Sequence, residues 1–351
     1  MVTEVEEPAE LVDVERLDRW ARKHFPGTSD PDLPLEATRI SSGASNEIFE
    51  LRRGADVWIL RRPPRVPLSP TAHDMVREYR VLAALDKTDV PHPHAVAGCS
   101  DDSVIGVPFY VMERIDGWTP RLPMPDDRWH APDVLRSMAF QLVDAIAQLS
   151  TVDFRAVGLE GFGKPDGYLE RQVNRWLGQL GQYQSRPLPH LEFLSTWLEH
   201  NRPPMAEAGI IHGDYQFVNT MFSETVPSRL LAVLDWEQST VGDPLVDIGW
   251  LLGTWDEEGE TSFRFEPQIS QLPGMPKRRE LAERYAERSG HPIEHLRYFE
   301  VLALFKLGCV MEGSYYRFQR GASTNPRHAQ LVITVPKMFE KAAAVAAGEL
   351  E

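Results

Sequence analysis

Two short polar segments, each set beside apolar runs, constrain this chain more than any other feature of its sequence. The first runs from His212 to Asn219 and has the spacing H-x-D-x-x-x-x-N. The second begins at Asp235, directly after the apolar run 230–234. Short apolar runs bounded by polar residues are typical of buried strands. The sequence therefore predicts a strand–loop–strand unit in which Asp214, Asn219 and Asp235 converge at one end.

These three side chains have the chemistry that phosphoryl transfer requires. A carboxylate within hydrogen-bond reach of an acceptor hydroxyl can orient it and take its proton, the role we assign to Asp214. Mg²⁺ prefers oxygen ligands, which Asn219 and Asp235 offer, and nucleotide phosphates would supply others. His212 follows an apolar pair and is expected to be a partly buried hydrogen-bonding residue that fixes the loop. The alternative is that these residues only cap backbone amides and form turns.

Composition limits the class of protein. The chain has 351 residues, 42% hydrophobic and 25% charged, which is ordinary for a globular protein large enough for two lobes. A net charge of −15 argues against nucleic acid as the main partner. No apolar run approaches the roughly 18 residues that cross a membrane, and the acidic N-terminus is unlike a signal peptide. Two cysteines make neither a disulfide framework nor a metal cluster, so we expect a cytoplasmic protein.

The periodicity of apolar residues changes along the chain. Residues 11–25 have the spacing of an amphipathic helix, residues 40–62 alternate as strands do, and residues 73–85 are again helical. The face of this last helix is expected to pack on the sheet through Val76, Tyr79, Leu82 and Ala83. Further helices are expected at about 131–151, 167–184, 190–200, 244–254, 277–289, 293–318 and 328–347.

The predicted fold class is α+β with two lobes. A small antiparallel β lobe should span residues 1–113, of which 1–30 form an added helical segment. A larger, mainly helical lobe, which carries the two polar segments, should span residues 114–351.

The motifs together resemble those of the aminoglycoside phosphotransferase and choline kinase family, which has a protein-kinase-like fold. In that family an H-G-D-x-x-x-x-N loop is followed by D-x-E and then by G-D-P-x-x-D. Here these motifs are residues 212–219, 235–237 and 242–247. The resemblance covers about residues 35–320. It implies transfer of the γ-phosphoryl group of ATP, with Mg²⁺, to a hydroxyl of a small molecule.

A narrower resemblance is carried by further segments, among them residues 60–64, 105–113 and 168–173. They are similar to the kinase domains found with some acyl-CoA dehydrogenases and to stand-alone bacterial relatives of those domains. This resemblance implies hydroxyacyl substrates, typically 4-hydroxyacyl-CoA, as an alternative to aminoglycosides. An alternative of another class is a catalytically silent nucleotide- or metabolite-binding protein.

The strand at 57–61 corresponds to the kinase strand that carries a phosphate-binding lysine. Arg61 is the candidate for that role, with Glu78 on the following helix as its ion-pair partner. Arginine keeps the positive charge and can bind phosphate oxygens through two nitrogens. Arg62 is the alternative, because adjacent residues of a strand face opposite sides of the sheet. A third possibility is that both arginines are surface charges.

Other residues implied for nucleotide binding lie in a loop and at the hinge between the lobes. Gly43 would let the backbone approach the phosphates, and Ser42 and Ser45 would donate hydrogen bonds. Met112 and Glu113 lie where backbone groups should contact adenine.

Two aspartates near the second polar segment have predicted structural roles. Asp243 precedes Pro244 and is expected to cap a helix at its first turn. Asp243 and Asp247 are expected to support the catalytic loop. By contrast, His92 and His94 are not predicted to bind metal, because no acidic or thiol cluster accompanies them in the sequence.

Substrate selection is expected among the helices of the second lobe. Arg171 and Arg175 would suit an anionic coenzyme A or carboxylate. The acidic run 256–258 would suit an amino sugar. Either set can equally be packing or solvated surface.

Overall fold

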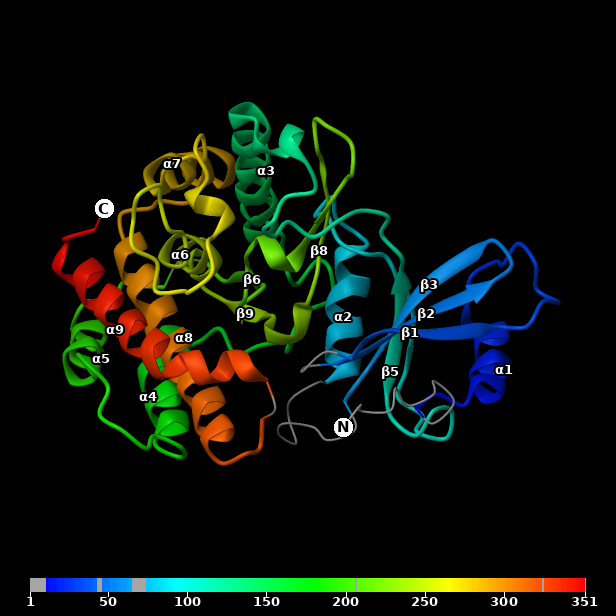
Figure 1. Ribbon diagram of the computed structural model, residues 1–351. Helices are drawn as coiled ribbons and strands as arrows, with labels where there is room; N and C mark the ends of the chain where they lie inside the picture. Colours follow the sequence, from blue (N-terminus) through cyan, green and yellow to red (C-terminus); the bar gives the residue numbers. More distant parts are fainter. Residues whose placement is uncertain (1–10, 43–45, 65–73, 206, 324, 351) are drawn as a thin grey trace. The chain divides into compact units, whose positions relative to one another are not determined.

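The computed structural model describes residues 11–42, 46–64, 74–205, 207–323 and 325–350 (Figure 1). The chain divides into two compact units. Unit 1 extends to Asp116 and also contains residues 157–159 and 232–239. Unit 2 contains the remaining residues, 117–156, 160–231 and 240–351. None of the helices in the described residues is long and apolar enough to cross a membrane.

Unit 1 is built on an antiparallel sheet with the strand order β1-β2-β3-β5-β4. The strands are β1 (Glu36–Ser42), β2 (Glu47–Arg53), β3 (Asp56–Arg62), β4 (Ala95–Cys99) and β5 (Phe109–Glu113). Burial alternates along β2, which places Phe49 and Leu51 in the core. Residues 53–56 form the tight turn between β2 and β3. Gly54 has a φ of 58° there, a left-handed conformation that glycine adopts without steric cost.

Helix α1 (Val14–His24) packs into the core of unit 1, as the spacing of residues 11–25 predicted. The Asp13 side chain accepts a hydrogen bond from the backbone N–H of Arg16 and caps the helix. Leu17 and Ala21 are fully buried and share one hydrophobic cluster with the sheet residues Phe49 and Phe109.

Helix α2 (Met75–Leu85) packs on β4 and β5. The prediction that Val76 faces the sheet was wrong, because its side chain is 49% exposed. The helix starts at Met75, so Met75, Glu78, Leu82 and Leu85 form the buried stripe. The sequence pattern misled because a charged residue occupies one position of that stripe.

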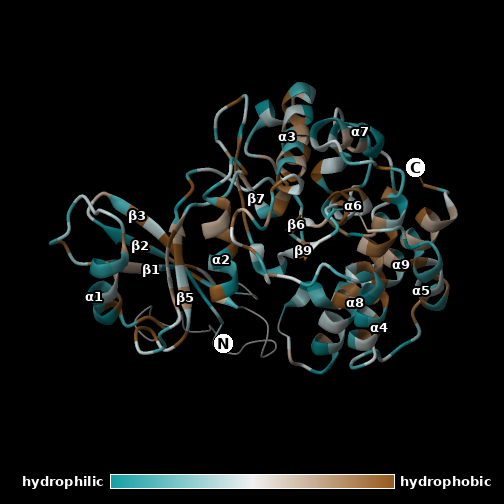
Figure 2. Cartoon of the chain, turned by 180° about the vertical axis from the view of Figure 1, so that it is seen from behind, coloured by the Kyte–Doolittle hydropathy of each residue, from teal (hydrophilic) through white to brown (hydrophobic). Residues whose placement is uncertain are grey.

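Unit 2 is mainly helical, and all seven helices predicted for it are present. They are α3 (Pro132–Ser150), α4 (Tyr168–Leu180), α5 (Leu191–His200), α6 (Leu245–Gly253), α7 (Arg278–Ser289), α8 (Leu296–Gln319) and α9 (Leu331–Ala347). Helix α8 packs against α4, α6 and α9. Figure 2 shows hydrophobic residues along α6, which is buried over almost its whole length.

The two polar segments follow short strands, as predicted. Strand β6 (Gly209–Ile211) pairs with β9 (Thr240–Gly242), and β7 (Thr220–Phe222) pairs with β8 (Leu230–Val233). Loop 212–219 therefore connects β6 to β7, and Asp235 lies just beyond the end of β8. With a small antiparallel β unit and a larger helical unit, the fold belongs to the predicted α+β class.

Candidate active site

The carboxylate of Asp214 is held in one orientation by two side chains of its own loop. Its Oδ1 accepts a hydrogen bond from Nε2 of Gln216 at 2.7 Å, and its Oδ2 accepts one from Nδ2 of Asn219 at 3.0 Å. The same Asn219 nitrogen donates to the Asp214 carbonyl at 2.8 Å. Because the amide nitrogen of Asn219 faces Asp214, its amide oxygen points away and is the atom that can bind a metal.

Asp247 of α6 fixes the backbone that precedes Asp214. Its two carboxylate oxygens accept hydrogen bonds from the backbone N–H groups of His212 at 2.7 Å and Gly213 at 2.8 Å. The Asp247 side chain is buried, and burial raises its pKa, although His212 and the two N–H groups oppose the shift. The buried His212 ring in turn accepts the N–H of Asp214 at its Nδ1, at 3.2 Å.

Two aromatic residues anchor the rest of the loop in unit 2. The hydroxyl of the fully buried Tyr215 donates to the carbonyl of Leu142 in α3 at 2.7 Å. The Phe217 ring lies 5.9 Å from Trp255 and 6.2 Å from Phe222, measured between ring centroids. The loop is thus packed on both sides of Gln216.

Lys306 of α8 contacts the same loop. Its Nζ donates a hydrogen bond to the carbonyl of Gly213 at 2.7 Å and lies 4.6 Å from the centroid of the Trp250 ring. Burial lowers the pKa of Lys306 to about 8, and the charges of Asp214 and Asp247 oppose this shift. The sequence reasoning missed this residue. Its only signal was a lysine in the middle of the apolar stretch of residues 301–310.

Substitution of Lys306 by methionine is expected to change how stability depends on pH. The pKa of Lys306 is about 8 in the folded chain, against an ordinary value of 10.5. Between these values the unfolded chain keeps a proton that the folded chain has lost, so raising the pH stabilises the folded state. The gain should be about 2 kcal/mol between about pH 7 and about pH 10.

Chemical denaturation across that pH range measures this effect. The free energy of unfolding of the wild type, minus that of Lys306→Met, should rise with pH. The exposed Lys23 offers a matched control, because Lys23→Met should show no such slope. A difference that stays flat with pH for Lys306→Met as well would contradict the prediction.

Unit 1 contains an ionic cluster around Arg61. Nη2 of Arg61 lies 3.0 Å from Oδ1 of Asp235 and 3.7 Å from Oε2 of Glu78. The hydroxyl of Tyr110 donates to the same Glu78 oxygen at 2.9 Å. Burial alone would lower the pKa of Arg61, but Tyr110, Glu78 and Asp235 together raise it above its ordinary value. Asp235 is one of the non-glycine residues with positive φ, at 64°, which directs the chain sharply after β8.

Arg62, the alternative phosphate-binding candidate, has different partners. Its Nη1 donates to the carbonyl of Leu11 and its Nε to that of Pro63 at 3.3 Å. Of the two arginines, Arg61 is therefore the one that contacts Glu78 and Asp235.

The other predicted nucleotide-binding residues are only partly described. Gly43 and Ser45 lie outside the described residues, and Ser42 is described by its backbone alone, at the end of β1. Met112 is buried in β5. The backbone N–H of Glu113 donates to the carbonyl of His94 at 2.9 Å, so this amide is already used within the sheet.

Asp243 lies at the start of α6. Its Oδ1 accepts the N–H of Leu245 at 3.0 Å, and Pro244 rather than Asp243 occupies the capping position of the helix. The carboxylate thus satisfies one of the N–H groups that a helix start leaves without an intrahelical partner.

The histidine pair of the proline-rich loop has an acidic neighbour that the sequence did not reveal. Oδ1 of Asp86 lies 3.0 Å from Nε2 of His92 and 2.7 Å from Nδ1 of His94. Its other oxygen accepts the N–H of Ala95 at 3.3 Å. Asp86 directly follows α2, so these contacts join the end of that helix to the start of β4.

A cavity of about 790 Å³ lies beside the Asp214 loop in unit 2. The loop contributes Gln216, Phe217 and Val218 to its lining. Because Gln216 also donates to Oδ1 of Asp214, the cavity is next to the candidate catalytic carboxylate. A small molecule of moderate size fits such a volume.

Comparison with known proteins places this arrangement in a family context. Residues 36–281 match the model of the phosphotransferase enzyme family. The chain is 33% identical over 341 residues to acyl-CoA dehydrogenase family member 11 of Gallus gallus, covering 93% of this chain and 42% of that protein. The rat protein of the same name is 32% identical over 348 residues. The chain thus spans less than half the length of these curated relatives.

Solved structures have the same fold. One protein from Ralstonia eutropha, provisionally assigned as an aminoglycoside phosphotransferase, is 30% identical, with a TM-score of 0.81, covering 96% of this chain and 99% of that one. A choline kinase from Cryptosporidium parvum is 13% identical, with a TM-score of 0.63, covering 96% of this chain and 97% of that one. The predicted protein-kinase-like fold and the predicted family resemblance are both confirmed.

Proposed function

Because the chain belongs to the phosphotransferase enzyme family, we propose that it is a kinase that transfers the γ-phosphoryl group of ATP to a hydroxyl of a small molecule. The observation that carries this proposal is the Asp214 carboxylate, held by Gln216 and Asn219 beside a cavity of about 790 Å³. A carboxylate in this position can orient an acceptor hydroxyl and remove its proton as the phosphoryl group moves.

The residues proposed to hold Mg²⁺ have suitable chemistry. Asn219 offers an amide oxygen and Asp235 a carboxylate, and hard cations such as Mg²⁺ prefer oxygen ligands. Arg61 contacts Oδ1 of Asp235 at 3.0 Å, and Oδ2 of the same carboxylate is the oxygen proposed to bind the ion. Bound Mg²⁺ would neutralise charge on the nucleotide phosphates.

Arg61 is proposed to bind the nucleotide phosphates, with Glu78 as its ion-pair partner. Their contact within unit 1 supports this, since the Glu78 carboxylate holds the Arg61 guanidinium, a group that can bind phosphate oxygens through paired N–H donors. Backbone groups near Met112 and Glu113 are proposed to contact adenine. The loop containing Ser42, Gly43 and Ser45 is proposed to cover the phosphates.

Asp247, His212 and Lys306 are proposed to act as positioning residues. Asp247 and Lys306 bind the N–H and the carbonyl of Gly213, and His212 binds the N–H of Asp214. Together they hold the backbone on which the proposed base depends, which preserves the geometry for proton transfer.

Two acceptor classes follow from the relatives. The names of the curated relatives refer to acyl-CoA dehydrogenases, which favours a hydroxyacyl-CoA, typically a 4-hydroxyacyl-CoA, as acceptor. The name of the Ralstonia eutropha structure favours an aminoglycoside. A catalytically silent nucleotide-binding protein is the alternative of another class.

Mg²⁺-dependent release of ADP tests the proposal. The acceptor panel would hold a 4-hydroxyacyl-CoA, its free hydroxy acid, an aminoglycoside and choline. ADP release that depends on one acceptor class, and that disappears with EDTA, is the expected result. ATP binding with no ADP release for any panel member would favour the silent binding protein, and failure to bind ATP would overturn the proposal.

A further inference from the structure

The cavity beside the Asp214 loop is lined by three arginines and a histidine. Arg121, Arg264, Arg327 and His130 line it, and among its described lining residues Glu266 is the only carboxylate. That carboxylate is paired with Arg327 at 3.2 Å. The cavity is therefore positive within a chain whose net charge is −15. A negatively charged ligand would be favoured there by Coulomb attraction.

Much of the remaining lining is apolar. The apolar lining residues include Pro120, Leu122, Met124, Leu251, Trp255 and Ile269. Apolar walls with a few polar groups are typical of small-molecule sites, in which the polar groups orient the ligand. This lining suits the aliphatic body of a ligand better than a sugar with hydroxyl and amino groups on every side.

Arg264 is the most buried of the three arginines. Its side chain is 24% exposed, against 72% for Arg327. Nη1 donates to the carbonyl of Thr254 at 2.9 Å, and the guanidinium carbon lies 4.5 Å from the centroid of the Phe263 ring. Across the described residues, Nε and Nη2 of Arg264 make no hydrogen bond. Two donors of a mostly buried cation are thus left for a ligand.

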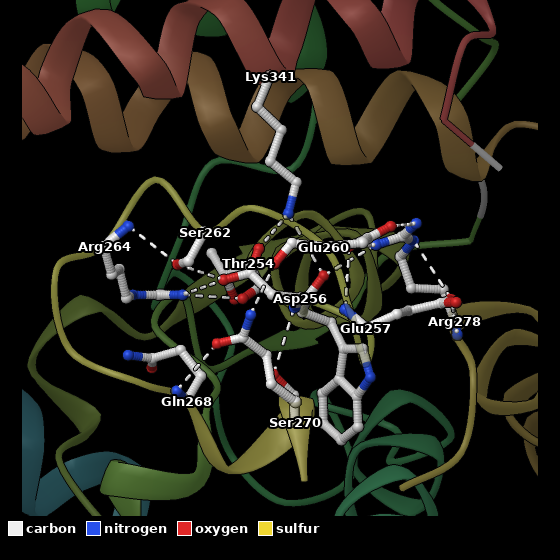
Figure 3. Close-up of polar contacts among 12 residues, drawn as sticks. Thr254, Asp256, Glu257, Glu260, Ser262, Arg264, Gln268, Ser270, Arg278 and Lys341 are labelled. Carbon is white, nitrogen blue, oxygen red and sulfur yellow. Dashed lines mark hydrogen bonds and ion pairs between the residues drawn. The ribbon is translucent and has the colours of Figure 1, made fainter. Parts of the chain in front are cut away.

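The carboxylate of Asp256, which lies near Arg264, is bonded to other side chains (Figure 3). Oδ2 of Asp256 lies 3.9 Å from Arg264, beyond hydrogen-bond distance, and accepts the hydroxyl of Ser262 at 2.6 Å. Its Oδ1 is paired with Lys341 at 2.8 Å. Burial lowers the pKa of Arg264, and the charges of Asp256 and Asp214 oppose this shift without cancelling it. The charge of Arg264 is therefore only partly compensated.

The acidic run 256–258 does not make the cavity acidic. Asp256 is fully buried and paired with Lys341. Glu257 accepts the backbone N–H of Arg278 at 2.8 Å and lies 3.7 Å from its side chain. These two carboxylates are thus neutralised by cations of the protein, which removes the basis for binding an amino sugar through this run.

We propose that Arg264 is a specificity-determining residue, which selects the acceptor by binding its anionic group, a carboxylate or a phosphate. A guanidinium binds either anion through paired N–H donors, so both share the same chemistry at this position. This rests on the proposed function, because the cavity is an acceptor site only if Asp214 acts on a hydroxyl. A polycationic acceptor would be repelled by the arginines and is excluded by the same argument.

The test compares four probes with the wild type, Arg264→Gln and Arg264→Lys. The probes are a medium-chain 4-hydroxy fatty acid, its coenzyme A thioester, the neutral diol of the same length and an aminoglycoside. Arg264→Gln should lower the ratio of kcat/KM for the anionic probes over the diol by about tenfold or more, and Arg264→Lys should restore part of it. If kcat/KM for the free acid responds to the substitution, Arg264 binds a carboxylate. If kcat/KM for the thioester responds, Arg264 binds the phosphates of coenzyme A.

Calorimetric binding of the same probes in the absence of ATP separates this proposal from the proposed function. If no probe is phosphorylated but the acid or thioester binds, and binds at least about tenfold more weakly to Arg264→Gln, the anion site stands and the kinase proposal fails. Arg279→Gln, at a side chain that is 86% exposed on α7, is the matched control and should behave like the wild type. Equal weakening for the diol and the anionic probes, or preference for the aminoglycoside, would overturn the proposal for Arg264. Melting temperatures of all variants show whether Arg264→Gln folds, and Arg264→Lys carries the test if it does not.

Discussion

Replacing Asp214 by asparagine is expected to lower turnover by about 100-fold to 10,000-fold. Asparagine has the same shape and can still accept a hydrogen bond from Gln216 or Asn219, but it cannot take a proton from an acceptor hydroxyl. The affinity for ATP should change little, since Asp214 is proposed to act on the acceptor, whereas Arg61 is proposed to bind the nucleotide. Steady-state kinetics and equilibrium binding of ATP measure the two effects separately.

Asp133→Asn is the matched control for this variant. Asp133 is an exposed carboxylate in the first turn of α3, and its substitution should leave turnover close to that of the wild type. Unchanged turnover in Asp214→Asn would overturn the assignment of the base. Equal losses of turnover and of ATP affinity would show that Asp214 acts on the nucleotide site instead.

Replacing Asp247 by alanine is expected to destabilise the chain by about 2–5 kcal/mol, because two buried N–H groups would lose their acceptors. These are the backbone N–H groups of His212 and Gly213, which now donate to the two carboxylate oxygens at 2.7 Å and 2.8 Å. Asp247→Asn keeps one of the two acceptor oxygens, so its loss in free energy of unfolding should be about half as large. Chemical denaturation measures the free energy of unfolding, and kinetics should show a fall in turnover as the loop loses its support.

Asp133→Ala again serves as the control. An exposed aspartate near a helix N-terminus contributes up to about 1 kcal/mol, so its loss should be clearly smaller. If Asp247→Ala lowers the free energy of unfolding by no more than about 1 kcal/mol, the N–H groups of His212 and Gly213 find other acceptors. The proposed support of the loop by Asp247 would then be wrong.

Elements with a strong local signal were predicted well. The helix expected at 131–151 is α3 (Pro132–Ser150), and the one expected at 293–318 is α8 (Leu296–Gln319). Their apolar residues recur at helical spacing, a signal that local sequence carries in full. The buried face of α2 was harder to predict, because it includes Glu78. Glutamate is rarely buried without a partner. That partner, Arg61, lies on a different element.

The spacing of the motifs predicted phosphoryl-transfer chemistry, and contacts between residues far apart in the sequence completed the candidate site. The segment 212–219 and Asp235 could be found in the sequence because phosphoryl transfer needs particular residue types at particular intervals. Lys306 had no motif, since its bond to Gly213 joins residues 93 positions apart. The acidic run 256–258 was open to two interpretations until its pairing with Lys341 and Arg278 was known.

The sequence by itself therefore determined the class of fold, the order of the elements, the family and the candidate catalytic residues, because periodicity and motif spacing are properties of short segments. Only the tertiary structure decided that Arg61 rather than Arg62 contacts Asp235, that Asp247 and Lys306 hold the backbone before Asp214, and that the cavity beside it is positive. Each of these depends on side chains far apart in the chain, and burial brings such groups together in ways that no local pattern encodes.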